Sequence, residues 1–121
     1  MKVEELNQAN FLEVVPQPGV VLVDCWAEWC GACRQFAPVF ERVAEDYPQH
    51  TFATVDASEE AELIRQLGIE HIPALLLYRD GLLLFKQPGY YEEDVLRDII
   101  SQAESLNMDL VRADMDRSEM P

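Results

Sequence analysis

Two hydrophobic periodicities alternate along this chain and predict helices and strands in turn. Apolar residues that recur every three or four positions predict helices over about Cys30–Tyr47, over Glu59–Leu67 and from Glu92 onward. Short apolar runs between them predict strands. The run Val20–Val23 is apolar on both faces, as a central strand covered by helices on both sides should be. The other predicted strands are Val3–Leu6, Thr51–Asp56, Ala74–Tyr78 and Leu82–Gln87.

A further short helix is expected near the N-terminus. Asn7 is a suitable N-cap residue, and the helix behind it would bury Phe11, Leu12 and Val15 before a Pro- and Gly-rich segment ends it. The complete order is therefore β-α-β-α-β-α-β-β-α.

The connections between these elements predict the sheet. Crossover helices join parallel strands, whereas Asp80 and Gly81 supply the positive φ angles of a tight hairpin and so add antiparallel ones. We therefore predict the α/β class, as a three-layer α/β/α sandwich with a central mixed sheet.

The end of the chain differs from the rest. Leu106 and Leu110 continue the apolar spacing of the last helix, which predicts two further turns and then a frayed, solvated tail. We accordingly divide the chain into a domain over residues 1–106 and an acidic extension over residues 107–121.

Composition narrows the possible partners. The chain has 121 residues, and 49% of them are hydrophobic, which is enough for the core of one domain. Its 23 acidic residues against 9 basic ones give a formal charge of −14, and such a surface repels nucleic-acid backbones and anionic lipid. We expect no nucleic-acid partner and no membrane partner, and we expect a monomer.

The cysteine content and the N-terminus bear on location. Met1–Leu6 lacks the basic region and apolar stretch of a secretory signal, which predicts a cytoplasmic protein. Three cysteines in an intracellular chain favour chemistry at a thiol over a structural disulfide framework.

The segment Cys30-Gly31-Ala32-Cys33 carries this chemistry. It follows a strand and opens a helix, so its two cysteines lie on one face of the first turn, close enough to bridge. Unpaired backbone N–H groups at the helix start, together with the charge of Arg34, should lower the pKa of the Cys30 thiol, while Cys33 lies deeper. One acidic, exposed thiol beside a buried partner suits thiol–disulfide exchange.

This segment in its wider context resembles the active-site segment of thioredoxins. The resemblance rests on residues 23–33 (VDCWAEWCGAC), on Ala37-Pro38, on Ile72-Pro73 and on Gly89 before the last helix. It runs from about Val3 to Leu106, and the WAEWC context makes it much more specific than a CxxC alone.

The resemblance implies a role for each matching residue. Cys30 would attack a substrate disulfide, Cys33 would resolve the mixed disulfide, and Asp24 would help to take the proton from Cys33. Independently, the position of Asp24 in an apolar strand predicts a raised pKa. The substrate would be a protein disulfide, no cofactor would be bound, and an NADPH-dependent flavoprotein reductase would restore the dithiol. The substrate-binding residues implied are Trp29, Gly31, Ala32, Ile72, Pro73 and Gly89, with Pro73 in a cis peptide bond.

Three positions depart from the family's usual pattern. Alanine replaces proline at Ala32, which should alter the reducing strength. Ala74 stands where threonine is common, and Thr54 stands where a lysine commonly faces the buried aspartate. Without that lysine, Asp24 should be harder to ionise than in a typical member.

Alternative functions remain open at this point. A less reducing exchanger or isomerase fits the change at Ala32, and an adaptor or co-chaperone would keep the fold with the thiols secondary. A closed zinc site needs four ligands, and His50 and His71 are far apart in sequence, so we expect no metal.

Several side chains near the cysteine segment also have interpretations that need no role in the chemistry. Cys25 is expected to be a small buried hydrophobe, His71 an exposed side chain without a role, and Tyr90 and Tyr91 either helix-end packing or an edge of the substrate groove.

Overall fold

The structure, a computed structural model, describes residues 3–119, and for residues 116–119 the backbone only. The predicted order of strands and helices is confirmed, and one helix is added at the end. The elements are β1 (Val3–Glu5), α1 (Phe11–Val14), β2 (Val20–Trp26), α2 (Gly31–Glu45), β3 (Thr51–Asp56), α3 (Ala61–Gln66), β4 (Ala74–Arg79), β5 (Leu82–Pro88), α4 (Glu93–Ser105) and α5 (Met108–Glu119).

The five strands form one mixed sheet in the order β1-β3-β2-β4-β5. The first three strands are parallel to one another, and β4 and β5 are antiparallel to their neighbours, as predicted. Asp80 and Gly81 turn β4 into β5 with φ angles of 50° and 84°, the left-handed geometry of a tight hairpin turn. Because parallel strands end at the same edge of a sheet, Glu5, Trp26 and Asp56 lie along one edge.

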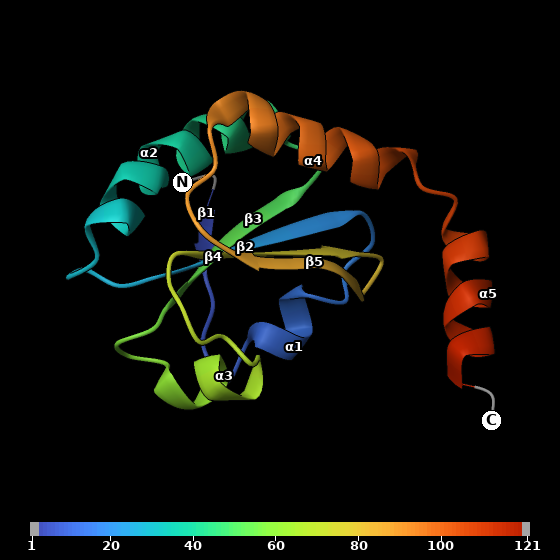
Figure 1. Ribbon diagram of the computed structural model, residues 1–121, viewed down its shortest axis with the longest axis horizontal. Coiled ribbons are helices and arrows are strands. Elements are labelled where there is room, and N and C mark those ends of the chain that lie inside the picture. The colour runs from blue at the N-terminus through green and yellow to red at the C-terminus, as the bar shows by residue number, and fades with distance from the viewer. Residues whose placement is uncertain (1–2, 120–121) are drawn as a thin grey trace.

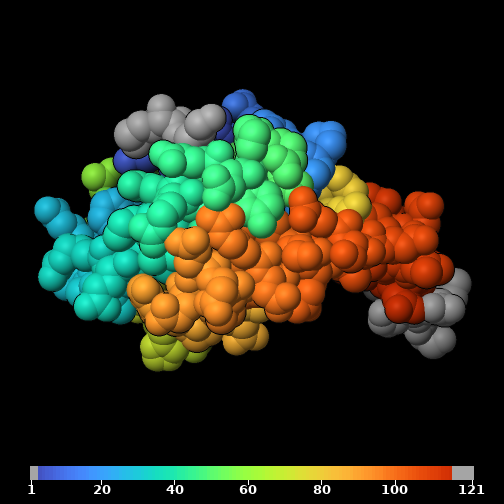
Figure 2. Space-filling model, turned by 90° about the horizontal axis from the view of Figure 1, so that it is seen from above, coloured from blue at the N-terminus to red at the C-terminus, as the bar shows by residue number. Residues whose placement is uncertain are grey.

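Two hydrophobic cores lie on the two faces of the sheet. Helices α2 and α4 cover one face, and α1 and α3 cover the other (Figure 1). Side chains alternate between these faces along β2, so that Leu22 packs toward α2 whereas Val23 packs toward α1 and α3. Seen from above, α2 and α4 lie side by side over their face (Figure 2). The fold is a three-layer α/β/α sandwich.

The N-terminal helix is shorter than predicted, and one of its residues was assigned wrongly. α1 has four residues, and Leu12 is 78% exposed whereas Phe11 and Val15 are buried. The N-cap of α1 is Asn10, which makes no side-chain capping hydrogen bond. Asn7 instead caps the turn that precedes α1, where its side-chain oxygen accepts hydrogen bonds from the backbone N–H groups of Ala9 and Asn10. A single helical turn buries only one narrow stripe, which leaves Leu12 in solvent.

The last helix does not continue into the C-terminal segment, so the prediction of a helix continuation with a frayed tail was wrong. α4 ends because Leu106 is extended (ψ 139°), and Asn107 then starts α5 by accepting hydrogen bonds from the backbone of Asp109 and Leu110. Met108 is buried, while Leu110 is exposed.

Candidate active site

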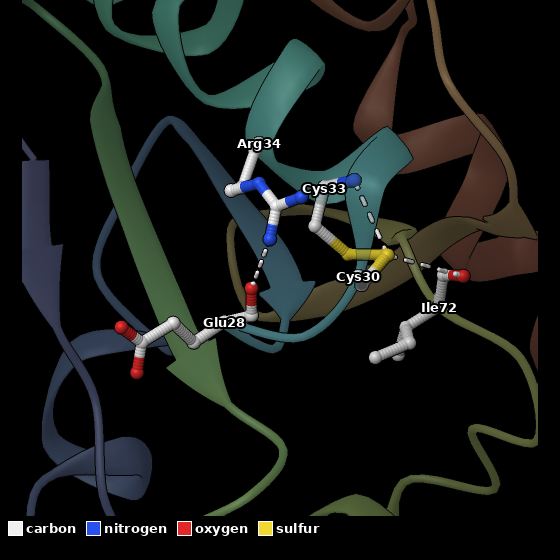
Figure 3. The surroundings of a disulfide bond; sticks show 5 residues. All are labelled: Glu28, Cys30, Cys33, Arg34 and Ile72. Carbon is white, nitrogen blue, oxygen red and sulfur yellow. Dashed lines mark hydrogen bonds between the residues drawn. A yellow bond between two sulfur atoms is a disulfide. The ribbon is translucent and has the colours of Figure 1, made fainter.

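The first turn of α2 brings the two predicted cysteines together. Cys30 is the N-cap residue of this helix, and its Sγ accepts a hydrogen bond of 3.2 Å from the backbone N–H of Cys33. The two form a disulfide with their Cα atoms 5.2 Å apart (Figure 3). The helix start therefore places one of its otherwise unpaired N–H donors directly on the Cys30 sulfur, where it can stabilise a thiolate.

The two cysteines differ in access. Cys30 is 8% exposed and Cys33 only 1%. Both cysteines are thus buried in the disulfide form, so the expectation of an exposed Cys30 was wrong, although Cys30 keeps more of its surface in solvent than Cys33 does. Arg34 lies on the loop side, where its guanidinium donates a 2.7 Å hydrogen bond to the carbonyl oxygen of Glu28 (Figure 3). Its positive charge thus stays fixed at the N-terminal end of α2.

A second loop borders the disulfide. The Ile72–Pro73 peptide bond is cis, as predicted. The carbonyl oxygen of Ile72 lies 3.9 Å from the Cys30 Sγ (Figure 3). Gly89 donates a 2.7 Å backbone hydrogen bond to the carbonyl of Pro73, with φ at +120°, a conformation that favours glycine. Three chain segments thus meet around Cys30.

The remaining predicted substrate-binding residues are open to solvent. Trp29, which immediately precedes Cys30, is 74% exposed, and Gly31 and Ala32 are exposed on the first turn of α2. A Cβ added at Gly31 would meet no atom within 4 Å apart from its chain neighbours and the backbone of its own helix, so the space beside Gly31 is open. A flat chain segment can therefore approach the sulfur atoms.

Asp24 is a buried carboxyl beneath this turn. It is 2% exposed and lies on the face of β2 that α2 covers, beside its register partner Thr54 on β3. Its Oδ1 has no hydrogen-bond partner among the described residues. Burial raises the pKa of Asp24 from 3.8 to about 7, as the sequence predicted in direction.

Cys25 is the free cysteine and points to the other face. It is fully buried in the core beneath α1 and α3. Burial, and secondarily the neighbouring Asp24 carboxylate, raises the pKa of the Cys25 thiol to about 12. It packs as a small apolar side chain in this structure.

The surroundings of the disulfide include one residue that sequence reasoning missed. Ala57, Trp26 and Ile72 pack against the small buried cluster of Ala27, Cys30 and Cys33. Its N–H donates a 2.7 Å hydrogen bond to the carbonyl of Trp26. The sequence was sufficient to predict this position, because Ala57 directly follows the β3 strand and must lie at the same sheet edge as the end of β2.

The tyrosine and histidine side chains near the site are also placed. Tyr90 and Tyr91 both pack edge-on against Phe36, and the Tyr91 hydroxyl donates a hydrogen bond to the carbonyl of Pro88. Tyr90 remains 39% exposed, whereas His71 is exposed and contributes to a hollow beside Lys86. Among the described side chains, those of residues 3–115, no three potential ligands come together for a metal. No helix within the described residues is long and apolar enough to cross a membrane.

A dithiol–disulfide pair at a helix start, with one accessible sulfur beside a cis-proline loop, defines a thiol–disulfide oxidoreductase. Known proteins agree with this class. The family model described as Thioredoxin matches residues 2–102. A protein named "Putative thioredoxin 2" from Streptomyces coelicolor is 45% identical over 108 residues, which cover 89% of this chain and 81% of that protein. The thioredoxin of Chlamydia muridarum is 35% identical over 83% of this chain and 97% of its own length.

Solved structures show the same relationship. A mutant thioredoxin from Halobacterium salinarum NRC-1 superposes with a TM-score of 0.80 and 31% identity, over 87% of this chain and 93% of that one. The chain belongs to the thioredoxin family, and the Cys30–Cys33 pair makes it a protein-disulfide oxidoreductase.

Proposed function

We propose that the chain reduces protein disulfides, with Cys30 as nucleophile and Cys33 as resolving thiol. The Cys30 thiolate attacks one sulfur of the substrate disulfide, forms a mixed disulfide and releases the other substrate sulfur as a thiolate. The Cys33 thiolate then attacks the Cys30 Sγ and releases the second substrate thiolate. Two electrons pass from the dithiol to the substrate. The single observation that carries this assignment is the difference in exposure between the two cysteine residues, 8% for Cys30 and 1% for Cys33.

Asp24 is the proposed proton acceptor for Cys33, through an intervening water. Its place beneath α2, its unpartnered Oδ1 and its pKa of about 7 support this role. A carboxyl that titrates near neutral pH can both accept and return a proton during turnover.

The substrate segment is proposed to lie across Trp29, Gly31, Ala32 and the Ile72–Pro73 loop, with Gly89 at its border. Three of these features support this position: the exposed indole, the free space above Gly31 and the hydrogen bond from Gly89 to Pro73.

The remaining assignments concern the cellular setting. We propose a cytoplasmic monomer whose redox domain spans residues 1–106. The chain itself binds no cofactor, and an NADPH-dependent flavoprotein reductase returns the disulfide to the dithiol. Family membership and the composition support these assignments.

The test of the cysteine roles is mixed-disulfide trapping with a disulfide-bonded protein such as insulin. Cys33→Ser should accumulate a covalent complex, because the first attack proceeds and the second cannot. Cys30→Ser should accumulate none, and Cys25→Ser, a buried control, should turn over normally. Equal trapping by the Cys30 and Cys33 variants would contradict the assignment.

A less reducing exchanger or isomerase is the second candidate, and the alanine at position 32 favours it. The two candidates differ in reduction potential, which is about −270 mV for thioredoxin and about −180 mV for protein disulfide isomerase. Titration of the Cys30–Cys33 pair against dithiothreitol decides between them. A value near the first supports the reductase, and a value near the second supports the exchanger.

A further inference from the structure

Charge is distributed unevenly around the disulfide. Five carboxylates lie on the β1–β3 side of the active-site edge, and we call this group the acidic flank. Three of them are exposed and two are half-buried. The acidic flank consists of Glu5, Glu28, Asp56, Glu59 and Glu60.

The sheet topology holds this flank close to Cys30. Asp56 ends β3 beside Trp26, the last residue of β2, and the next residue, Ala57, packs against the two cysteines. The backbone N–H groups of Glu59 and Glu60 both donate to the carbonyl of Asp56. The side chains of Glu5, Asp56, Glu59 and Glu60 line one hollow of about 120 Å³.

Glu28 is the member of the acidic flank that lies on the active-site loop. It lies two residues before Cys30, and its carboxylate extends away from the guanidinium of Arg34, which is bonded to its backbone carbonyl instead (Figure 3).

Cations do not neutralise this group. In the part of the chain with described side chains, no Lys, Arg or His forms an ion pair with any of the five carboxylates. Arg34 bonds the backbone carbonyl of Glu28 and not its carboxylate, and Arg65 on α3 is paired with Glu62. The other lysines and arginines of this part are also engaged elsewhere, with carboxylates or backbone carbonyls: Arg42, Arg79, Lys86, Arg97 and Arg112.

The opposite border of the disulfide is balanced. Glu70 and His71, which precede the Ile72–Pro73 loop, share a hollow of about 150 Å³ with Lys86. The negative field at the active site is therefore strongest on the β1–β3 side, and the chain's formal charge of −14 reinforces it.

We propose that the acidic flank selects the substrate class: proteins whose accessible disulfide lies next to a basic surface. This inference rests on the proposed reductase function and adds the chemistry of the partner to it. A basic segment beside the substrate disulfide meets the carboxylates of the acidic flank while its sulfur reaches Cys30. The attraction acts on the encounter and is screened by salt.

The test uses two disulfide-bridged peptides of identical sequence except that the residues flanking each cysteine are lysine in one and glutamate in the other. The second-order rate of reduction by the dithiol protein is followed by tryptophan fluorescence. At low ionic strength the lysine peptide should react at least about tenfold faster. In about 1 M salt, where the Debye length is about 3 Å, the ratio should approach one. Equal rates at low salt would overturn the proposal.

Two charge-matched variants locate the effect. Glu28→Gln with Glu59→Gln should lower the lysine-to-glutamate ratio about threefold. Glu41→Gln with Glu45→Gln removes the same charge from positions of α2 about 16 and 22 Å along the helix from Cys30. This pair should lower the lysine-to-glutamate rate ratio by less than the first pair does. An equal decrease would assign the selectivity to net charge alone and overturn the role of the acidic flank.

Reduction of hydroxyethyl disulfide, which is small and uncharged, by the unaltered protein distinguishes failure of the substrate-class proposal from failure of the proposed reductase function. If it is reduced while the two peptides react equally, only the substrate-class inference fails. If neither it nor the peptides are reduced, the proposed reductase function fails.

Discussion

The two edges of the sheet differ in whether their buried or half-buried polar side chains are hydrogen-bonded. At the active-site edge, Asp24 is buried with one oxygen unpartnered. At the other edge, Nη1 of Arg79 lies 2.6, 3.1 and 2.7 Å from the carbonyl oxygens of Ala103, Glu104 and Leu106, which share its two N–H groups. His50 there lies 2.8 Å from the Glu104 carboxylate and accepts a hydrogen bond from Val20 through its other ring nitrogen.

This difference separates stability from chemistry. Buried polar groups are normally hydrogen-bonded, and one that is not lowers the stability of the fold. The edge with Arg79 and His50 follows this rule and ties α4 to the sheet. The edge with Asp24 breaks it at the position of the proposed proton acceptor. The comparison predicts that altering Asp24 stabilises the fold, whereas altering the opposite edge destabilises it without touching the reaction.

The largest expected effect is at Asp24. Its pKa is raised from 3.8 in the unfolded chain to about 7 in the fold, so between these values the folded state binds the extra proton. Stability therefore falls as pH rises through this window and levels off above it. Asp24→Asn removes this loss, so at pH 9 the oxidised variant should be more stable by on the order of 4 kcal/mol, and at pH 4 the two should be nearly equal.

Urea unfolding of the oxidised proteins at pH 4, 7 and 9 measures this difference. Asp98→Asn, an exposed change on α4, serves as the control and should shift stability by less than about 0.5 kcal/mol at every pH. A difference between Asp24→Asn and the unaltered protein that does not depend on pH would show that Asp24 is ionised in the fold throughout. The same variant should slow reduction of insulin near neutral pH, since Cys33 loses its proton acceptor.

Much of this edge could be predicted because its signals are local. The position of Cys30 at a helix start and the apolar run around Asp24 are visible in the sequence, and the Asp80–Gly81 pair specified the hairpin. The roles of Cys30 and Asp24 in turnover stay predictions until they are measured.

The opposite edge could not be predicted in the same way. The hydrogen bonds from Arg79 join residues more than 20 positions apart in sequence, so no local sequence pattern predicts them. The break after α4 was missed for another reason. The spacing of Leu106 and Leu110 is that of one continuous helix, and the prediction followed this spacing. Asn107 between them is a good N-cap residue and marks the start of a new helix.

An intermediate effect is expected at Arg79. Arg79→Ala leaves the last carbonyls of α4 without their charged donor, and part of the loss is recovered by water because this end is partly exposed. We expect a loss of about 2 kcal/mol in the free energy of unfolding, with the rate of insulin reduction unchanged. Arg65→Ala, which breaks an exposed ion pair with Glu62, is the matched control and should cost less than about 0.5 kcal/mol. Equal losses of stability in the two variants would show that the hydrogen bonds of Arg79 stabilise the fold no more than an exposed ion pair does.

The smallest effect is expected from removing residues 107–121. Met108 is the buried side chain of α5, and its apolar contact is partly offset by the entropy of ordering the helix, so truncation should cost about 1 kcal/mol. Met108→Ser in the full chain should reproduce this loss, whereas Leu110→Ser, at a site 66% exposed, should leave stability unchanged. The rate of insulin reduction should stay the same in all three, because α5 follows the edge opposite the disulfide. A truncated chain that keeps its stability but loses activity would place part of the function on that edge, and the separation of stability from chemistry would fail.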